Sequence, residues 1–140
     1  MEVPDNAIDL AMFFEGFYAK PYICPAGYWT IGYGHLCSKN HPQITKAQAE
    51  VYLAEDLQDA LAGTLRLCPG LMIDDRILGA IVDFTFNLGS GRLQTSTLRR
   101  KINQGALDEV PYQLSRWAYG GGKKLKGLVL RRQAEAVYFM

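Results

Sequence analysis

Hydrophobic and polar positions along the chain follow two different periods, which separate a short strand region from several helices. Apolar residues recur every three or four positions over residues 5–15 and again over residues 45–65, as on one face of a helix. Between these segments, residues 17–23 and 28–33 are rich in aromatic and β-branched types, and the Pro-Ala-Gly that separates them is typical of a turn. The pattern predicts a helix, a β-hairpin and a second, longer helix.

The longer helix is the clearest element that the pattern predicts. Thr45 and Gln48 fit a capping box at its start, and apolar residues follow at four-residue intervals. About 20 residues at a rise of about 1.5 Å make a helix about 30 Å long, as wide as a small domain. We expect this helix to join a hairpin lobe, about residues 15–60, to a helical lobe made of residues 1–14 and 65–140.

The rest of the chain has the periodicity of shorter helices. A run of three glycines, residues 120–122, is expected to form a flexible joint before the last of them. Together the elements predict one domain over residues 1–140 with a mostly helical α+β fold and a cleft between its two lobes, where an extended substrate would bind. The shorter helices are expected at about residues 74–89, 96–105, 108–117 and 128–139.

Composition and charge exclude several classes of function. A formal net charge of +1 gives no reason to expect nucleic acid as a partner. No apolar run reaches the roughly 18 residues of a membrane span, so we expect no stable membrane anchor. Cys24, Cys37 and Cys68 match no zinc spacing, so we expect neither a metal nor a cofactor. The odd number of cysteines favours synthesis in a reducing cytoplasm and leaves open whether any two of them pair.

The segment that begins at Glu15, EGFYAKPYICPAGYWTIGYGHLC, carries the candidate chemistry. A carboxylic acid ends the first helix, and a thiol, Cys24, and a hydroxyl, Thr30, follow on the hairpin. Cleavage of a glycosidic bond needs a proton donor on one side of the bond and an activated water or a nucleophile on the other. Glu15 suits the first role, because the end of a helix and neighbouring phenylalanines favour a protonated carboxylic acid.

This segment resembles the catalytic segment of phage lysozymes of glycoside hydrolase family 24, which have the phage T4-type lysozyme fold. Its pattern is Glu, eight residues, Asp or Cys, five residues, Thr. The segments FNLGSGRLQTSTLRRKINQG and GLVLRRQAEAVYF resemble the central helical segment and the closing helix of the family, in the same order. The resemblance implies an endolysin that hydrolyses the β-1,4 bond between N-acetylmuramic acid and N-acetylglucosamine in peptidoglycan and so lyses the host cell.

The resemblance also implies roles for single residues. Glu15 matches the general acid, Cys24 stands where many members have Asp, and Thr30 matches the hydroxyl that helps to place the attacking water. These three residues are the catalytic candidates. The positions that line the substrate cleft of the family match Tyr22, Gly34, Leu36, Phe86, Asn87 and Thr97.

Charged residues elsewhere are expected to support this site. The resemblance implies that an arginine on the closing helix, Arg131 or Arg132, orients the acid. It also implies a structural ion pair between His35 and Asp56, which would tie the hairpin lobe to the long helix. The two arginines end a basic run over residues 123–132, which is typical of a solvated face and alternatively would attract the protein to an anionic cell wall.

Cys24 leaves three mechanisms open. A thiol with an ordinary pKa of about 8.5 is mostly protonated at neutral pH, so a cation or backbone donors would have to favour its thiolate if Cys24 activates water as a base. A thiolate that attacks the sugar carbon directly would instead retain the anomeric configuration. In the third mechanism Glu15 and Thr30 carry most of the rate, and Cys24 only shapes the site.

Two other functions compete with hydrolysis. A lytic transglycosylase needs the acid but no positioned water, so Thr30 and a base-like group at position 24 argue against it. A catalytically inactive module that binds the cell wall would not need Glu15.

The resemblance implies that peptidoglycan is the partner, and we expect a monomer. Because no signal-arrest-release segment precedes the first helix, the chain resembles endolysins made in the host cytoplasm that reach periplasmic peptidoglycan after a holin permeabilises the membrane. Alternatively, such a segment has been removed.

Overall fold

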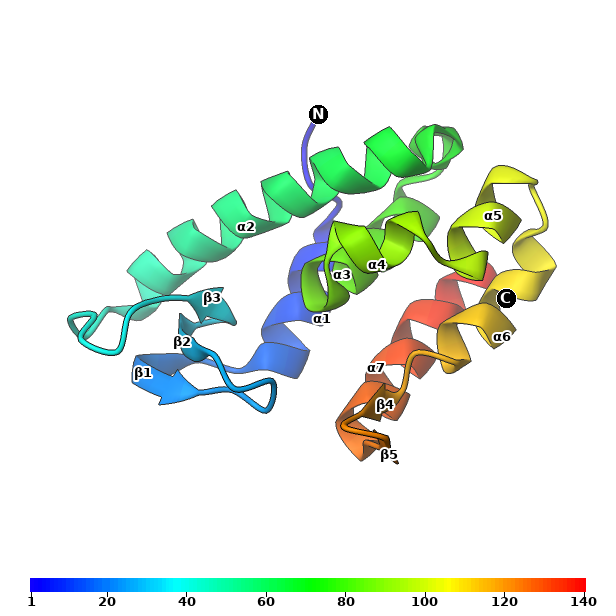
Figure 1. Ribbon diagram of the computed structural model, residues 1–140. Coiled ribbons are helices and arrows are strands. Elements are labelled where there is room, and N and C mark those ends of the chain that lie inside the picture. Colours follow the sequence, from blue (N-terminus) through cyan, green and yellow to red (C-terminus); the bar gives the residue numbers. More distant parts are fainter.

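A single helix of 22 residues, α2 (Lys46–Leu67), runs along most of the molecule in the computed structural model, which describes residues 1–140 (Figure 1). The hydroxyl of Thr45 accepts a hydrogen bond from the backbone N–H of Gln48, and the Gln48 side chain accepts one from the backbone N–H of Thr45. The predicted capping box is therefore confirmed. One end of α2 lies beside a small sheet and the other beside a group of helices (Figure 1).

The small sheet is antiparallel and has the order β1 (Tyr18–Ile23), β2 (Trp29–Gly32), β3 (His35–Leu36). Tyr22 on β1 lies opposite Thr30 on β2, and an irregularity in the pairing separates Tyr22 from the start of β1. The hairpin formed by β1 and β2 was predicted. The third strand was not, because two residues are too few to leave an alternating pattern in the sequence.

The buried helix α3 (Asp75–Leu88) forms the centre of the helical lobe and packs against α1, α2 and α7. The side chain of Asp74 caps it by accepting a hydrogen bond from the backbone N–H of Arg76. Helix α4 was not predicted, and residues 107–109 form a separate 3₁₀ turn before α6. The other helices are α1 (Asp5–Glu15), α4 (Ser90–Gln94), α5 (Thr97–Asn103), α6 (Val110–Ser115) and α7 (Lys126–Ala136), with further 3₁₀ turns at Pro69–Ile73 and Val137–Phe139.

The three glycines before α7 form a tight turn rather than a flexible joint. Gly120 ends the short strand β4 (Tyr119–Gly120), and Gly121 and Gly122 connect it to the strand with which it pairs, β5 (Lys123–Lys124). Gly121 and Gly122 have φ angles of +58° and +80°, which residues with side chains rarely adopt. The glycines are thus explained by the geometry of the turn.

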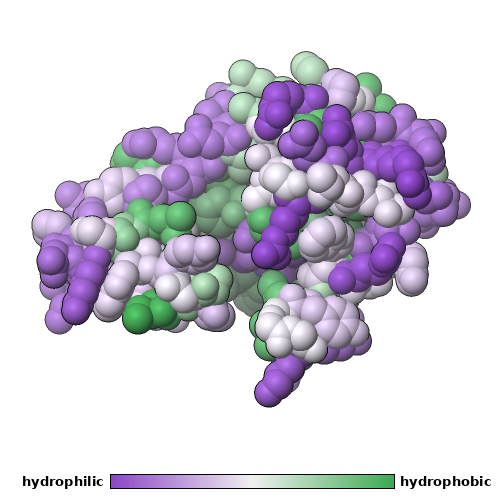
Figure 2. Space-filling view, viewed as in Figure 1, coloured by the Kyte–Doolittle hydropathy of each residue, from purple (hydrophilic) through white to green (hydrophobic).

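One continuous core of 24 buried residues runs through the molecule. It includes Ile31 from the sheet, Leu57 from α2 and Phe84 from α3, so the sheet and the helices pack on common side chains. The mostly helical α+β fold is therefore confirmed. The face drawn in Figure 2 is hollowed between the sheet and the helices, with hydrophobic residues at the bottom of the hollow. None of the helices combines the length and the apolar character needed to cross a membrane.

Candidate active site

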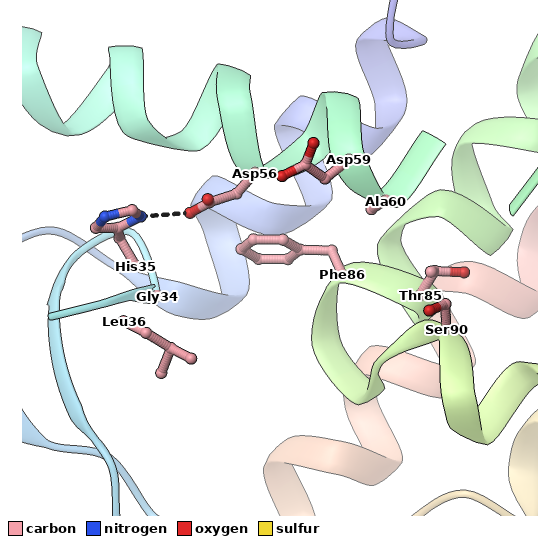
Figure 3. Close-up of a pocket in the computed structure, with 9 residues that line it drawn as sticks. All are labelled: Gly34, His35, Leu36, Asp56, Asp59, Ala60, Thr85, Phe86 and Ser90. Atoms are coloured by element: carbon pink, nitrogen blue, oxygen red, sulfur yellow. Dashed lines mark hydrogen bonds and ion pairs between the residues drawn. The ribbon is translucent and has the colours of Figure 1, made fainter. Parts of the chain in front are cut away.

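A cavity of about 340 Å³ lies where the sheet, α2 and the start of the helical lobe meet (Figure 3). Its volume is within the range of small-molecule binding pockets. Phe86 points from α3 into the space between the walls, towards the turn that carries Gly34 (Figure 3). The residues that line it are Gly34, His35, Leu36, Asp56, Asp59, Ala60, Thr85, Phe86 and Ser90. Three of the six predicted cleft residues, Gly34, Leu36 and Phe86, are thus brought together.

Glu15 is the last residue of α1, and its carboxyl group lies directly behind the wall of this cavity. A Cβ atom built on Gly34 would be 2.8 Å from both Cδ and Oε1 of Glu15, closer than real Cβ atoms come. Gly34 also has a φ of +76°, which favours glycine. The turn between β2 and β3 can therefore approach the carboxyl group only because position 34 has no side chain.

Arg131 on α7 holds the Glu15 carboxylate. Its Nη1 donates a hydrogen bond to Oε2 of Glu15 at 2.7 Å, and the side chains of the two residues are 5% and 19% exposed. The guanidinium lies between the rings of Phe14 and Phe86, 5.6 Å and 5.9 Å from their centroids. Phe13, in contrast, is exposed to solvent. Glu15 is thus fixed by a buried cation and is only partly enclosed by apolar side chains.

Arg132 has different partners from its neighbour. Its Nη2 donates hydrogen bonds to Asn87 Oδ1 at 2.8 Å and to Glu135 Oε2 at 2.9 Å. Of the two arginines, therefore, it is Arg131 that contacts Glu15. Both arginines are buried while the lysines of the basic run are exposed, so the prediction of a solvated face is wrong for the two arginines.

Cys24 lies in the turn between β1 and β2. Its backbone N–H donates to the Tyr28 carbonyl at 2.9 Å, and its own carbonyl accepts from the N–H of Gly27 at 2.8 Å. Burial disfavours the Cys24 thiolate, but hydrogen bonds from the backbone of Tyr28, the Thr30 hydroxyl and the backbone of Ala26 and Gly27 outweigh it and lower the pKa of the thiol. Backbone donors, rather than a cation, thus favour the thiolate.

Thr30 is buried on β2, and its hydroxyl has a single proton to donate. In the structure that proton goes to the Tyr28 carbonyl at 2.9 Å. Rotation of the hydroxyl would direct the same proton to the sulfur of Cys24, where it would stabilise a thiolate. The Thr30 hydroxyl can therefore donate either to the Tyr28 carbonyl or to the Cys24 sulfur, and a negative charge on the sulfur favours the second.

Tyr22 faces Thr30 across the hairpin and lies near both candidate groups. Burial, together with the charges of Glu15, Tyr18 and Cys24, raises the pKa of the Tyr22 phenol to about 12. The phenol therefore stays neutral at any pH at which the protein would act. Its ring stacks on that of Tyr18, with 4.0 Å between the centroids. Tyr22, Asn87 and Thr97, the other three predicted cleft residues, do not line the cavity.

His35 and Asp56 form a contact at the edge of the cavity. His35 Nδ1 lies 2.7 Å from Asp56 Oδ2, as the dashed line in Figure 3 marks. The imidazole also stacks on Tyr52 of α2, with 4.5 Å between the ring centroids. These contacts join β3 to α2 at the edge of the cavity.

Two buried acidic residues near the site, Asp83 and Glu135, were missed in the sequence. Asp83 lies in the middle of the apolar segment DRILGAIVDFTFNL, and this position within a buried helix was the available signal. A charge in such a position requires a partner of opposite charge. The closing helix, α7, carries two arginines, Arg131 and Arg132. Asp83 accepts two hydrogen bonds from Arg131.

The chain matches known proteins over nearly its whole length. The family described as Phage lysozyme matches residues 12–135, which include all three catalytic candidates. An endolysin of Acyrthosiphon pisum secondary endosymbiont phage 1 is 36% identical over 99% of this chain and 98% of its own length. A SAR-endolysin of Bacteriophage PS119 is 38% identical over 86% of this chain and 73% of its own length.

Other relatives are longer, and the fold is found among solved structures. The chain spans 54% of the endolysin of Bacillus phage B103, with 34% identity. The muramidase domain of SpmX from Asticaccaulis excentricus superposes with a TM-score of 0.85 and 25% identity, over 99% of this chain and 97% of that domain. The similarity thus extends across both the sheet and the helices.

Proposed function

Because the chain belongs to the phage lysozyme family and is a muramidase of the endolysin type, we propose that Glu15, Cys24 and Thr30 carry out its hydrolysis of peptidoglycan. The observation that carries the proposal is the position of the Glu15 carboxyl group, pinned by Arg131 at 2.7 Å and packed against Gly34 in the wall of the cavity. The bond cleaved would be the β-1,4 bond between N-acetylmuramic acid and N-acetylglucosamine.

In the proposed reaction Glu15 donates its proton to the glycosidic oxygen as the bond from that oxygen to the anomeric carbon breaks. Water attacks the anomeric carbon from the opposite side, placed by the Thr30 hydroxyl, and gives up a proton to the Cys24 thiolate. Exchange with solvent then returns a proton to Glu15 and removes one from Cys24. Leu36 and Phe86, which line the cavity, offer apolar surface to the sugar rings.

The reaction class is tested with purified protein and insoluble peptidoglycan. A muramidase releases soluble fragments and creates one new reducing sugar end for each bond cleaved. Fragments released without new reducing ends would mean either that the peptide part of the wall is cleaved or that a transglycosylase forms anhydro ends, and either result would refute the proposed function.

Replacement of Cys24 tests whether this thiol takes part in the reaction or only shapes the site. Cys24→Asp should retain activity, and Cys24→Ala should lose about 100-fold in rate, because loss of a general base typically costs this much. Cys37→Ala is the matched control, since burial raises the pKa of that half-buried thiol and we assign it no role. An unchanged rate in Cys24→Ala would remove the thiol from the mechanism.

Proton NMR of the first-formed anomer completes this test. Water activated by a Cys24 base gives a product of inverted configuration. A retained configuration would instead identify Cys24 as the nucleophile.

We further propose that the protein is made in the host cytoplasm and reaches the periplasmic peptidoglycan only after the membrane is permeabilised, for example by a holin. The three cysteines are all free thiols, which supports a reducing site of synthesis. Cells that express the chain alone should continue to grow, and co-expression of a holin should cause lysis. Lysis without any holin would contradict this proposal and leave the chemistry untouched.

A further inference from the structure

The guanidinium of Arg131, which contacts Glu15, also contacts a second carboxylate, that of Asp83. Arg131 donates from Nε to Asp83 Oδ2 at 2.9 Å and from Nη2 to Asp83 Oδ1 at 2.7 Å, while its Nη1 serves Glu15. Asp83 is fully buried, on the middle of α3. One planar cation on α7 thus bridges two carboxylates, one facing the cavity and one in the core.

We propose that Asp83 is a positioning residue for the catalytic acid, which fixes Arg131 through two hydrogen bonds and offsets its charge. The proposal rests on the proposed function, in which Glu15 donates a proton. It explains how a carboxyl group in contact with a buried arginine can still serve as an acid, since an unopposed cation would favour the carboxylate.

The charges of the three groups show why the second carboxylate matters. When Glu15 is protonated, Asp83 and Arg131 form a neutral pair in the interior. With Asp83 ionised, its negative charge opposes a second negative charge on the other side of the Arg131 guanidinium. Without the charge of Asp83 this opposition is lost, and the Arg131 cation acts on Glu15 alone.

The groups around Asp83 leave it as the ionised member of the cluster. Burial works against the Asp83 carboxylate, but hydrogen bonds from Arg131 and Glu135 outweigh it and lower the pKa of Asp83. Burial, followed by the hydrogen bond with Asp83, raises the pKa of Glu135 well above its ordinary range, although Arg132 opposes this. Of these two carboxyl groups, Asp83 is therefore the one whose charged form its surroundings favour, while those of Glu135, which pairs with Arg132, work against its charged form.

On the side of the cavity, Glu15 faces Arg131 and the phenol of Tyr22, with Cys24 beyond the phenol. Tyr22 does not ionise in the range of the test, because its pKa is about 12. The thiol of Cys24 does titrate, but it does so in every variant compared below. It therefore contributes nothing to the difference between them.

The test is the dependence of kcat/KM on pH in Asp83→Asn, which keeps the shape of the side chain and removes its charge. The alkaline limb of the profile should move to lower pH by about one unit, the low end of the effect of a nearby charge.

Glu135→Gln is the matched control: it changes a carboxyl group of the same cluster that contacts Arg132 and not Arg131, so its alkaline limb should stay in place. A folded Asp83→Asn protein with an unchanged limb, or an equal shift in Glu135→Gln, would overturn the proposal.

A second measurement needs no change at Asp83, in case Asp83→Asn does not fold. In Glu15→Gln, NMR should still show the Arg131 Nε–H protected from exchange with solvent, because Asp83 rather than Glu15 holds the guanidinium. Rapid exchange of this proton in Glu15→Gln would overturn the proposal.

The two proposals fail in different ways. Full activity in Glu15→Gln would refute the proposed function itself. An inactive Glu15→Gln together with an unmoved alkaline limb in Asp83→Asn would refute only the role of Asp83.

Discussion

Glu15→Gln should reduce the release of fragments from peptidoglycan by about 10²–10⁴-fold, the usual cost of losing a general acid. The amide has the size of the carboxyl group and can still accept a hydrogen bond from Arg131, but it has no acidic proton to give to the leaving oxygen. Because Asp83 continues to hold Arg131, the fold should remain intact. Initial rates on purified peptidoglycan and circular dichroism measure the two effects.

Glu109→Gln provides the control for this change. Glu109 also pairs with a cation, Lys101 at 3.2 Å, but its side chain is half exposed and lies on the 3₁₀ turn before α6. This variant should keep the wild-type rate. If both variants lost activity equally, the effect would not belong to the acid, and if Glu15→Gln remained active, Glu15 would not be the proton donor.

Arg131→Met should lower the free energy of unfolding by about 3–5 kcal/mol, the typical effect of removing one partner of a buried ion pair. The change leaves the Asp83 carboxylate in the core without its cation and Glu15 without its anchor. Activity should fall as well, because the acid loses its orientation. Unfolding in urea at neutral pH measures the loss of stability.

Two comparisons sharpen this prediction. Arg100→Met changes an exposed arginine on α5 and should cost little. Arg131→Met combined with Asp83→Leu should recover much of the lost stability, since a buried ion pair can often be replaced by apolar side chains. A single variant as stable as the wild type would contradict the account of the buried pair.

The effect of Arg131→Met should also depend on pH. The pKa of Asp83 is lowered in the folded protein, so the ion pair contributes stability above the ordinary pKa of an aspartate and loses it as the pH falls towards the folded value. The difference between wild type and variant should therefore shrink on acidification. A constant difference would mean that the stability does not come from the charge of Asp83.

The sequence predicted the elements whose signals are local. The capping box of Thr45 and Gln48 and the period of the following residues were enough for α2, and aromatic and β-branched runs around a Pro-Ala-Gly turn were enough for the hairpin. The strand β3 and the helix α4 are too short to establish a period, and only their packing against neighbouring elements stabilises them. The turn at Gly121 and Gly122 depends on the pairing of β4 with β5, which three glycines do not indicate by themselves.

The sequence indicated candidate site residues through their spacing along the chain. It could not indicate contacts that depend on how the helices pack together. The spacing of Glu15, Cys24 and Thr30 made them the catalytic candidates, and Gly34 lies in the same hairpin. Arg131 and Arg132 are neighbours in the sequence, and only the packing of α7 against α1 and α3 decides that the first of them reaches Glu15.

The most direct test of the central claim is the mass of the terminal sugar at the chain end newly formed by cleavage, in fragments that the wild-type protein releases from purified peptidoglycan. An acid at Glu15 acting with a water placed by Thr30 and activated by Cys24 predicts hydrated N-acetylmuramic acid at that end. An anhydro sugar, lighter by one water molecule, would show that no water attacks the anomeric carbon and would contradict the account.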